Sequence, residues 1–230
     1  GWGQGPTHSQ NLQAWFAHLP GLKVVMPTTA NDAKGLLMSS IFDDNPVLFL
    51  EHRWLHNVLG EVPESFYSTP LGTANRVREG DAVTIVAMSY MTIEAIHAAD
   101  FLAGRGIYCD VIDLRTIRPL DWIAVFNSVK RTGRLLALDT GHKTGSVAGE
   151  VLARVSSECW ENLKCAPQRI AMPDYPEGTS SALTDTYHPR AETIVERVAT
   201  MIGMKINLNT LIEQRDCPHD VPGDWFTGPF

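Results

Sequence analysis

From about residue 82 onward, short apolar runs alternate with longer segments of helical period. This alternation constrains the fold more than any other feature of the sequence. The predicted strands are Ala82–Ala87, Ile107–Ile112, Leu135–Leu138 and Gln168–Met172, and the predicted helices are Met91–Ala103, Leu120–Lys130, Val147–Cys159 and Ala191–Ile202. Strands that alternate with helices of about 12 residues form β-α-β units. Right-handed crossovers between such units give an α/β fold, a doubly wound layer on a mainly parallel sheet.

The first part of the chain shows the same alternation on a smaller scale. In order, it predicts a glycine-rich loop at Gly1–Gln10, a helix at Ser9–His18, a strand at Leu22–Met26, a helix from Asn31 or Asp32 to Phe42, and a strand at Val47–Leu50. Ser9 is the expected N-cap of the first helix, and Asn31 or Asp32 that of the second. The last run is continuously apolar, so we expect it to be covered on both faces.

Glycine and proline divide the chain into two α/β units. Residues 57–70 follow neither period and contain Gly60, Pro63 and Pro70, which is typical of a linker. We therefore expect one unit at 1–56 and a second at 71–204. The remaining residues, 205–230, are rich in proline and glycine and are expected to form an arm on the surface.

Charge and composition exclude several classes of protein. The chain has 19 Lys and Arg against 26 Asp and Glu, a net charge of −7, which argues against a nucleic-acid partner. No apolar run approaches the roughly 18 residues that a membrane span needs, so we expect no membrane partner. The four cysteines form no C-x-x-C pair and are expected to be free thiols.

Two loops at the predicted ligand-binding edge contain histidine. Open parallel sheets bind ligands beyond the carboxyl ends of their strands. The first loop, Gly1–Gln10, carries His8 directly before a predicted helix, where it either contacts an anionic ligand or simply caps the helix. The other loop, Thr140–Gly145, carries His142 and Lys143, and it either holds an anion or is a plain turn that faces water.

A third loop, Ser40–Pro46, offers oxygen ligands. A helix that ends there leaves unpaired carbonyls, and Ser40, Asp43 and Asn45 add side-chain oxygens. The loop is either a site for a hard cation or an ordinary helix stop. Arg115 and Arg118 follow a predicted strand; they either bind a ligand or an interface partner, or form structural salt bridges.

Several separate motifs resemble one known family. The run GPTHSQNLQAWFAHLPGLKVVMPTTANDAKGLLMSSIFDDNPVLFLEH (residues 5–52) is similar to beta subunits of thiamine-diphosphate-dependent 2-oxoacid dehydrogenases. PLGTANRVREGDAVTIVAMSYM, VIDLRTIRPLD, TGRLLALDTGHKTGSVAGEV and APQRIAMPDYP resemble the transketolase-type C-terminal domain of the same subunits, in the same order. The resemblance covers roughly residues 5–203. It implies the end of a pyrimidine-binding α/β domain at 1–56 and a transketolase-type C-terminal domain at 71–204.

The resemblance implies roles for particular residues. His8 matches a histidine that lies near the reactive carbon of thiamine diphosphate. Ser40, Asp43 and Asn45 match a loop that holds a potassium ion in some members. Arg115 and Arg118 fall in a domain that mainly builds the dimer interface, which implies packing or assembly. The family's activating glutamate lies far upstream of the His-Ser-Gln motif, so we expect this chain to be a beta-subunit fragment that is inactive alone.

The resemblance also implies a reaction and partners. The parent reaction would be decarboxylation of a 2-oxoacid, with transfer of the acyl group to a lipoyl-bearing acyltransferase. The expected partners are an alpha subunit and a second beta subunit in a heterotetramer, with magnesium held by the partner subunit or by a missing domain. The expected location is the bacterial cytoplasm or the mitochondrial matrix. The alternatives are another thiamine enzyme, of transketolase or deoxyxylulose-phosphate-synthase type, and a non-catalytic dimerisation module.

Overall fold

A five-stranded sheet forms the centre of the larger part of the molecule. The computed structural model describes residues 5–215 and 217–228. The strand order is β3-β5-β4-β7-β8, with β3 at Asn75–Arg78, β4 at Thr84–Ala87, β5 at Asp110–Asp113, β7 at Leu135–His142 and β8 at Gln168–Met172. Four strands are parallel, and only the edge strand β3 runs antiparallel. The predicted mainly parallel α/β sheet is confirmed.

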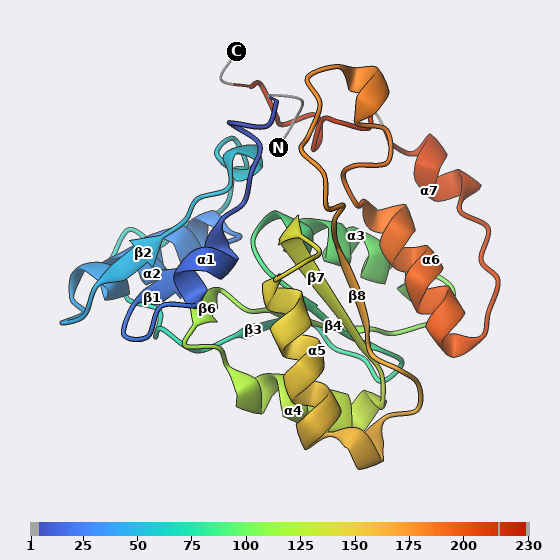
Figure 1. The fold of residues 1–230 in the computed structure, drawn as a ribbon, viewed down its shortest axis with the longest axis horizontal. Helices are drawn as coiled ribbons and strands as arrows, with labels where there is room; N and C mark the ends of the chain where they lie inside the picture. Colours follow the sequence, from blue (N-terminus) through green and yellow to red (C-terminus); the bar gives the residue numbers. More distant parts are fainter. Residues whose placement is uncertain (1–4, 216, 229–230) are drawn as a thin grey trace.

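Helices cover both faces of this sheet (Figure 1). On one face, α3 (Tyr90–Ala103) and α6 (Ala191–Ile202) pack on Ile85, Val111 and Leu136. On the other face, α4 (Trp122–Thr132) and α5 (Val147–Glu158) pack on Val86, Ile112 and Ala137. Successive residues of a strand point to opposite faces, so each strand supplies both cores, and the layer is doubly wound as predicted.

A second, three-stranded sheet joins the two parts of the chain. Its order is β2-β1-β6, with β1 at Lys23–Val25, β2 at Val47–Phe49 and β6 at Thr116–Arg118. The first two strands come from the N-terminal part, together with α1 (Gln13–Ala17) and α2 (Ala30–Ile41). The third comes from the larger part and pairs with β1 in the antiparallel sense. The small sheet therefore ties the two parts together through backbone hydrogen bonds.

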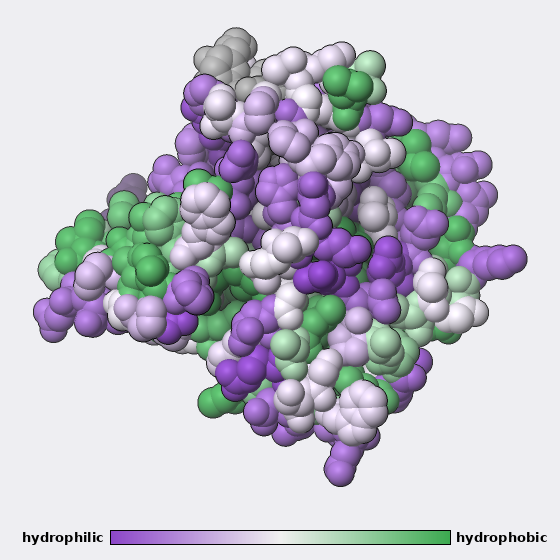
Figure 2. All heavy atoms as spheres, viewed as in Figure 1, coloured by the Kyte–Doolittle hydropathy of each residue, from purple (hydrophilic) through white to green (hydrophobic). Residues whose placement is uncertain are grey.

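Several details differ from the sequence-based predictions. The helix α1 begins after Leu12, so Ser9 is not its cap; Thr29, rather than Asn31 or Asp32, caps α2 and accepts a hydrogen bond from the Asp32 backbone N–H. The strand β2 is only partly buried because it is an edge strand with β1 as its neighbour. Apolar residues gather at the left of Figure 2, over β2 and α2. The short strands β3 and β6 were missed.

The C-terminal residues, which were predicted to form an arm on the surface, contact the core. A short helix, α7 (Asn209–Glu213), follows α6, and Trp225 and Phe226 pack against the cluster beneath α3 and α6. The Trp225 indole donates a hydrogen bond to the carbonyl of Trp54 in the 3-10 turn η1 (Arg53–Leu55), at 3.1 Å. Two further turns are η2 (Trp160–Asn162) and η3 (Ser181–Leu183). In the described part of the chain, no helix is long and apolar enough to cross a bilayer.

An ion pair lies beside the small sheet. The Arg115 guanidinium is 2.7 Å from the carboxylate of Asp32, whose side chain is only 2% exposed. Arg115 lies between β5 and β6, and Asp32 lies in the first turn of α2, so the pair spans the two parts of the chain. The prediction that Arg115 forms a structural salt bridge is therefore confirmed. Arg118, which is exposed, donates to the carbonyl of Ala17 at 3.1 Å.

We expect Arg115→Met to lower the free energy of unfolding by about 3–5 kcal/mol, because it leaves Asp32 as a buried charge without its partner. Arg118→Met serves as the matched control and should cost less than about 1 kcal/mol, since only one exposed contact is lost. Urea unfolding of the 230-residue chain measures both. Equal losses in the two variants would show that the buried pair does not hold the parts together.

Candidate functional site

Asp139 organises the edge of the large sheet where the N-terminal segment meets it. Its carboxylate accepts hydrogen bonds from the Gln13 amide at 2.6 Å, from the Gly141 backbone at 2.8 Å and from the Ala148 backbone at 3.0 Å. Asp139 is fully buried, and burial raises the pKa of its carboxyl despite these donors. One side chain therefore positions α1, the end of β7 and the start of α5 together.

A cavity of about 500 Å³ lies at this meeting point. It is lined by residues 10–15 and 18 of the N-terminal segment, by residues 139, 141 and 142 at the end of β7, and by residues 144–146 of the loop that follows. The structure thus brings two of the three loops that the sequence singled out to one cavity. It lies at the carboxyl end of β7, which is where an open parallel sheet binds ligands.

His8 lies near this cavity in the chain but does not line it. The residue is exposed, and its Nδ1 is 3.0 Å from the hydroxyl of Thr7. The helix begins five residues later, at Gln13, so His8 does not cap it. Gly5 precedes His8 in the same glycine-rich loop. Its φ is +73°, and a Cβ added at this position would lie 2.9 Å from the Thr179 side chain. Residues 1–4 of the predicted loop lie outside the described residues.

The loop after β7 is held by its own hydrogen bonds. His142 lies at the end of β7, with Nδ1 2.7 Å from the carbonyl of Pro173. Thr144 donates from its backbone and its hydroxyl to Asp174, both at 2.8 Å, and these bonds hold the pKa of Asp174 below its ordinary value. His142 lines the cavity beside α1, whereas Lys143 lines a different cavity.

The loop at Ser40–Asn45 lies at the end of α2, away from both histidines. Ser40 donates to the carbonyl of Leu36 at 2.7 Å. Asp43 is ion-paired with Lys23 and also accepts from the backbone and side-chain amides of Asn45, at 2.9 and 3.1 Å. The hydrogen bond from Lys23, followed by those from Asn45, lowers the pKa of Asp43 to about 2. Both carboxylate oxygens therefore have protein partners, and a cation would compete with Lys23.

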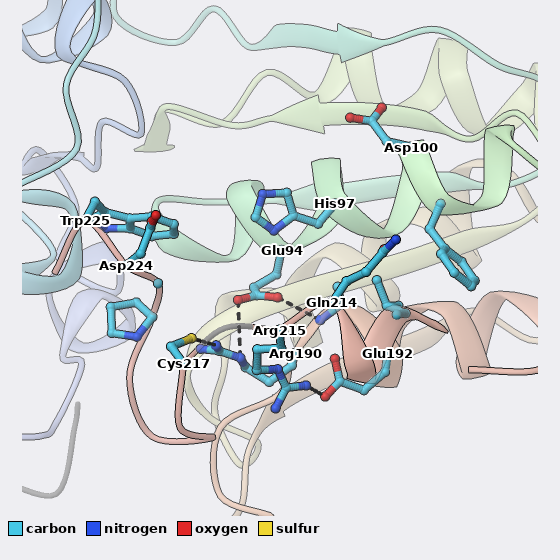
Figure 3. A pocket seen from close by; sticks show the side chains of 15 residues that line it. Glu94, His97, Asp100, Arg190, Glu192, Gln214, Arg215, Cys217, Asp224 and Trp225 are labelled. Carbon is cyan, nitrogen blue, oxygen red and sulfur yellow. Dashed lines mark hydrogen bonds and ion pairs between the residues drawn. The ribbon is translucent and has the colours of Figure 1, made fainter. Parts of the chain in front are cut away.

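A buried polar network links α3 to the C-terminal residues (Figure 3). The Glu94 carboxylate accepts hydrogen bonds from the Tyr90 hydroxyl and, at 2.7 Å, from the Ala191 backbone N–H. It also lies 3.5 Å from the Arg190 guanidinium. Burial, followed by the charge of Glu94, raises the pKa of Tyr90 well above its ordinary value, so Tyr90 stays protonated and donates. Arg190 also donates to the carbonyl of Val221, and Cys217 lies against it. This network is structural.

A second buried pair lies beside it. His188 Nε2 is 3.0 Å from the Glu177 carboxylate, and both side chains are at most 1% exposed. The ring of Trp54 lies 4.8 Å from that of His188, centre to centre. This pair anchors the long loop between β8 and α6 against η1. Sequence reasoning missed it, since no spacing relates these residues.

The described residues form no cluster of acidic, histidine or cysteine ligands for a metal ion. Over residues 5–215 and 217–228, no three His, Cys, Asp or Glu side chains come together as ligands for an ion. All four cysteines are free, as predicted. A cofactor bound through a metal-held diphosphate therefore does not fit on these residues alone, and no catalytic step is derived for them in isolation.

Comparison with known proteins identifies the family. The description "Transketolase, C-terminal domain" matches residues 72–194, and "Transketolase, pyrimidine binding domain" matches residues 2–57. The chain belongs to this transketolase-type family, as the sequence motifs indicated. Its fold is similar to that of a solved structure described as "Split gene transketolase, inactive beta4 tetramer". The TM-score is 0.67 at 25% identity, covering 84% of this chain and 61% of that one.

Named relatives narrow the resemblance to beta subunits. The chain is 42% identical to the acetoin:2,6-dichlorophenolindophenol oxidoreductase subunit beta of Cupriavidus necator, covering 86% of this chain and 59% of that protein. It is also 42% identical to the 2-oxoisovalerate dehydrogenase subunit beta of Bacillus subtilis, covering 74% and 52%, and to the pyruvate dehydrogenase E1 component subunit beta of Rhizobium meliloti, covering 83% and 42%. The chain thus spans roughly half the length of these relatives.

Asp113, at the end of β5 beside Arg115, provides a pH-dependent test of the junction. The pKa of Asp113 is raised from 3.8 to about 7, mainly because the carboxyl is buried. Hydrogen bonds from Thr28 and from the Arg115 backbone lower this pKa, and the nearby charge of Asp32 raises it further. The folded chain therefore holds this proton more tightly than the unfolded chain. The stability it contributes is present at low pH and is lost as the pH rises from about 4 to about 7.

We expect Asp113→Asn to gain stability relative to the parent chain as the pH rises through this window, because the amide does not ionise. Urea unfolding of both chains between pH 4.5 and 8 measures the difference. His52 titrates in the opposite sense, since burial lowers its pKa to about 3, but it is common to both chains and cancels. A difference that stays constant across the range would contradict a protonated Asp113.

Proposed function

We propose that the chain is part of the beta subunit of a thiamine-diphosphate-dependent 2-oxoacid dehydrogenase. The parent enzyme would decarboxylate a 2-oxoacid and pass the acyl group to a lipoyl-bearing acyltransferase. The observation that carries this proposal is about 40% identity to three kinds of beta subunit over most of the chain. A transketolase-type or deoxyxylulose-phosphate-synthase-type reaction is less well supported, since the solved transketolase is only 25% identical.

The proposal includes an assembly. We propose an alpha subunit and a second beta subunit as partners, with magnesium bound outside the residues described here. We also propose that the chain consists of a first α/β unit at 1–56, a linker at 57–70, a second α/β unit at 71–204 and a tail at 205–230. The three named relatives are bacterial, and a further relative, 40% identical, is the mitochondrial pyruvate dehydrogenase E1 component subunit beta-2 of Oryza sativa. These relatives support a location in the bacterial cytoplasm or the mitochondrial matrix.

We expect the isolated chain to show no 2-oxoacid decarboxylase activity with thiamine diphosphate and magnesium. In this family the carboxylate that activates the cofactor ring is supplied by residues upstream of the His-Ser-Gln motif. Release of carbon dioxide from pyruvate and from a branched-chain 2-oxoacid measures the activity. Supplying a full-length beta-type N-terminal segment and an alpha subunit should restore turnover and acyl transfer to a lipoyl domain.

Two outcomes of this reconstitution would contradict the proposal. Turnover by the isolated chain, above that of a heat-inactivated sample, would contradict a cofactor site shared with other residues. A reconstituted complex that transfers a two-carbon ketol group between sugar phosphates, but not an acyl group to a lipoyl domain, would favour the transketolase alternative. A complex that assembles without binding thiamine diphosphate would favour the dimerisation module.

We propose that His8 is the residue of this chain that acts at the reacting end of the cofactor. In the reconstituted enzyme, His8→Ala should lower kcat by about 100-fold or more, as expected for a polar group aimed at the transition state. The melting temperature should not change, because His8 is exposed and its side-chain contact is with Thr7. His97→Ala, an exposed histidine on α3, is the matched control. Equal kcat values in the two variants would contradict a role of His8 at the cofactor.

We also propose that Ser40, Asp43 and Asn45 bind a monovalent cation, with potassium as the expected ion. Potassium should raise the melting temperature of the chain more than an equal ionic strength of a large organic cation, because a ligand of the folded state stabilises it. Asp43→Ala should abolish this difference. Lys23→Met should enlarge it, since Lys23 occupies the same carboxylate. Equal melting temperatures in both salts would leave the loop as a helix stop.

A further inference from the structure

A second cavity, of about 640 Å³, lies along the edge strand β8, between this strand, α6 and the C-terminal residues. Five cationic side chains line it: Lys143, Arg169, Arg190, Arg197 and Arg215. Among the described residues, two carboxylates line it, those of Asp185 and Glu192. The chain as a whole has a net charge of −7, so this cavity is a local exception to its charge.

Among the described residues, three of these cations form no ion pair, although Lys143 lies close enough to Asp174 for its charge to help lower the pKa of that carboxyl. Arg190 is ion-paired with Glu94, and Arg215 with Glu192. Within the described part of the chain, Lys143, Arg169 and Arg197 have no carboxylate within ion-pair distance. Neutral groups position the two arginines instead, so their charge remains available to a ligand.

The two arginines are held by side-chain contacts, and Lys143 is held through its backbone. The Arg169 guanidinium lies 3.5 Å from the Ser146 hydroxyl at the start of α5. The Arg197 guanidinium, on α6, donates to the Gln168 amide oxygen at 3.1 Å. The Lys143 backbone donates to the carbonyl of Met172 at 2.9 Å, which fixes it at the end of β8. The two arginine side chains are therefore preorganised donors, which lose less entropy on binding and so favour a bound anion.

The edge strand distributes these charges around the cavity. Ile170 and Met172 of β8 are buried, whereas the alternating Arg169 is only partly buried. One arginine therefore approaches from the α5 side of the sheet and the other from α6. Figure 2 shows hydrophilic side chains gathered over β8, near the centre of the face drawn. Ile170, Pro189 and Ile212 add an apolar portion to the lining.

We propose that this cavity binds a small anion that carries at least two negative charges on phosphate or carboxylate groups. The volume is in the range of ordinary small-molecule sites, and guanidinium groups are the preferred partners of both kinds of oxyanion. The site is independent of the proposed enzymatic function, because none of its lining residues is placed in that chemistry.

The test is calorimetric titration of the 230-residue chain with pyrophosphate and, separately, with succinate, in matched chloride buffer. Arg169→Gln and Arg197→Gln should each weaken binding about tenfold or more, as expected for the loss of one charge-assisted hydrogen bond. Asp185→Asn should tighten it, because a repelling carboxylate is removed. Arg105→Gln is the matched control: Arg105 is exposed, stacks on Phe101 and lies outside the cavity.

The proposal is supported if either probe binds saturably and the variants change its affinity as expected. The probe that binds more tightly shows whether the site prefers phosphate or carboxylate groups. Melting temperatures of the variants show whether a loss reflects unfolding rather than a lost contact. The proposal is overturned if neither probe binds, or if both arginine variants bind like the Arg105 variant. It is equally overturned if the wild-type chain self-associates and the arginine variants do not, since the cations would then belong to a protein interface.

Discussion

The antiparallel pairing of β6 with β1 is the contact on which the arrangement of this molecule depends. It places Thr116 opposite Val25 and so brings the end of the large sheet against the N-terminal strands. The Arg115–Asp32 ion pair lies beside it and closes the junction. Among the described residues, the two non-glycine positions with positive φ, Ser89 and Arg115, follow β4 and β5 at this same junction. Strained backbone persists only where surrounding contacts fix it, as they do here.

Asp139 extends this constraint to the candidate site. A buried carboxylate is stable only if it is hydrogen-bonded, so the amides of Gln13, Gly141 and Ala148 must stay in place around it. The cavity beside His142 is consequently built by the same residue that docks α1 on the sheet. The shape of this cavity and the docking of the N-terminal segment are therefore coupled through one side chain.

The sequence predicted the elements with strong periodicity and missed those that depend on distant partners. The helix at Ala191–Ile202 was predicted with the right bounds, because its apolar face repeats regularly. The three-residue strand β6 has no period of its own and exists because β1 lies beside it. The same holds for the site: His142 and Lys143 were singled out by type, but no local pattern indicates that they line different cavities. The Gln13–Asp139 bond joins residues 126 positions apart, and no local signal predicts it.

The C-terminal residues illustrate how a buried charge recruits distant segments. The Arg190 guanidinium is nearly inaccessible to solvent, and its donors must find acceptors within the protein. Glu94 and the Tyr90 hydroxyl, both on α3, supply two partners, and the carbonyl of Val221 supplies a third. Because that carbonyl belongs to the tail, the tail completes the solvation of a buried cation. Trp225 then fixes the tail to η1, so a segment with little regular structure becomes part of the core.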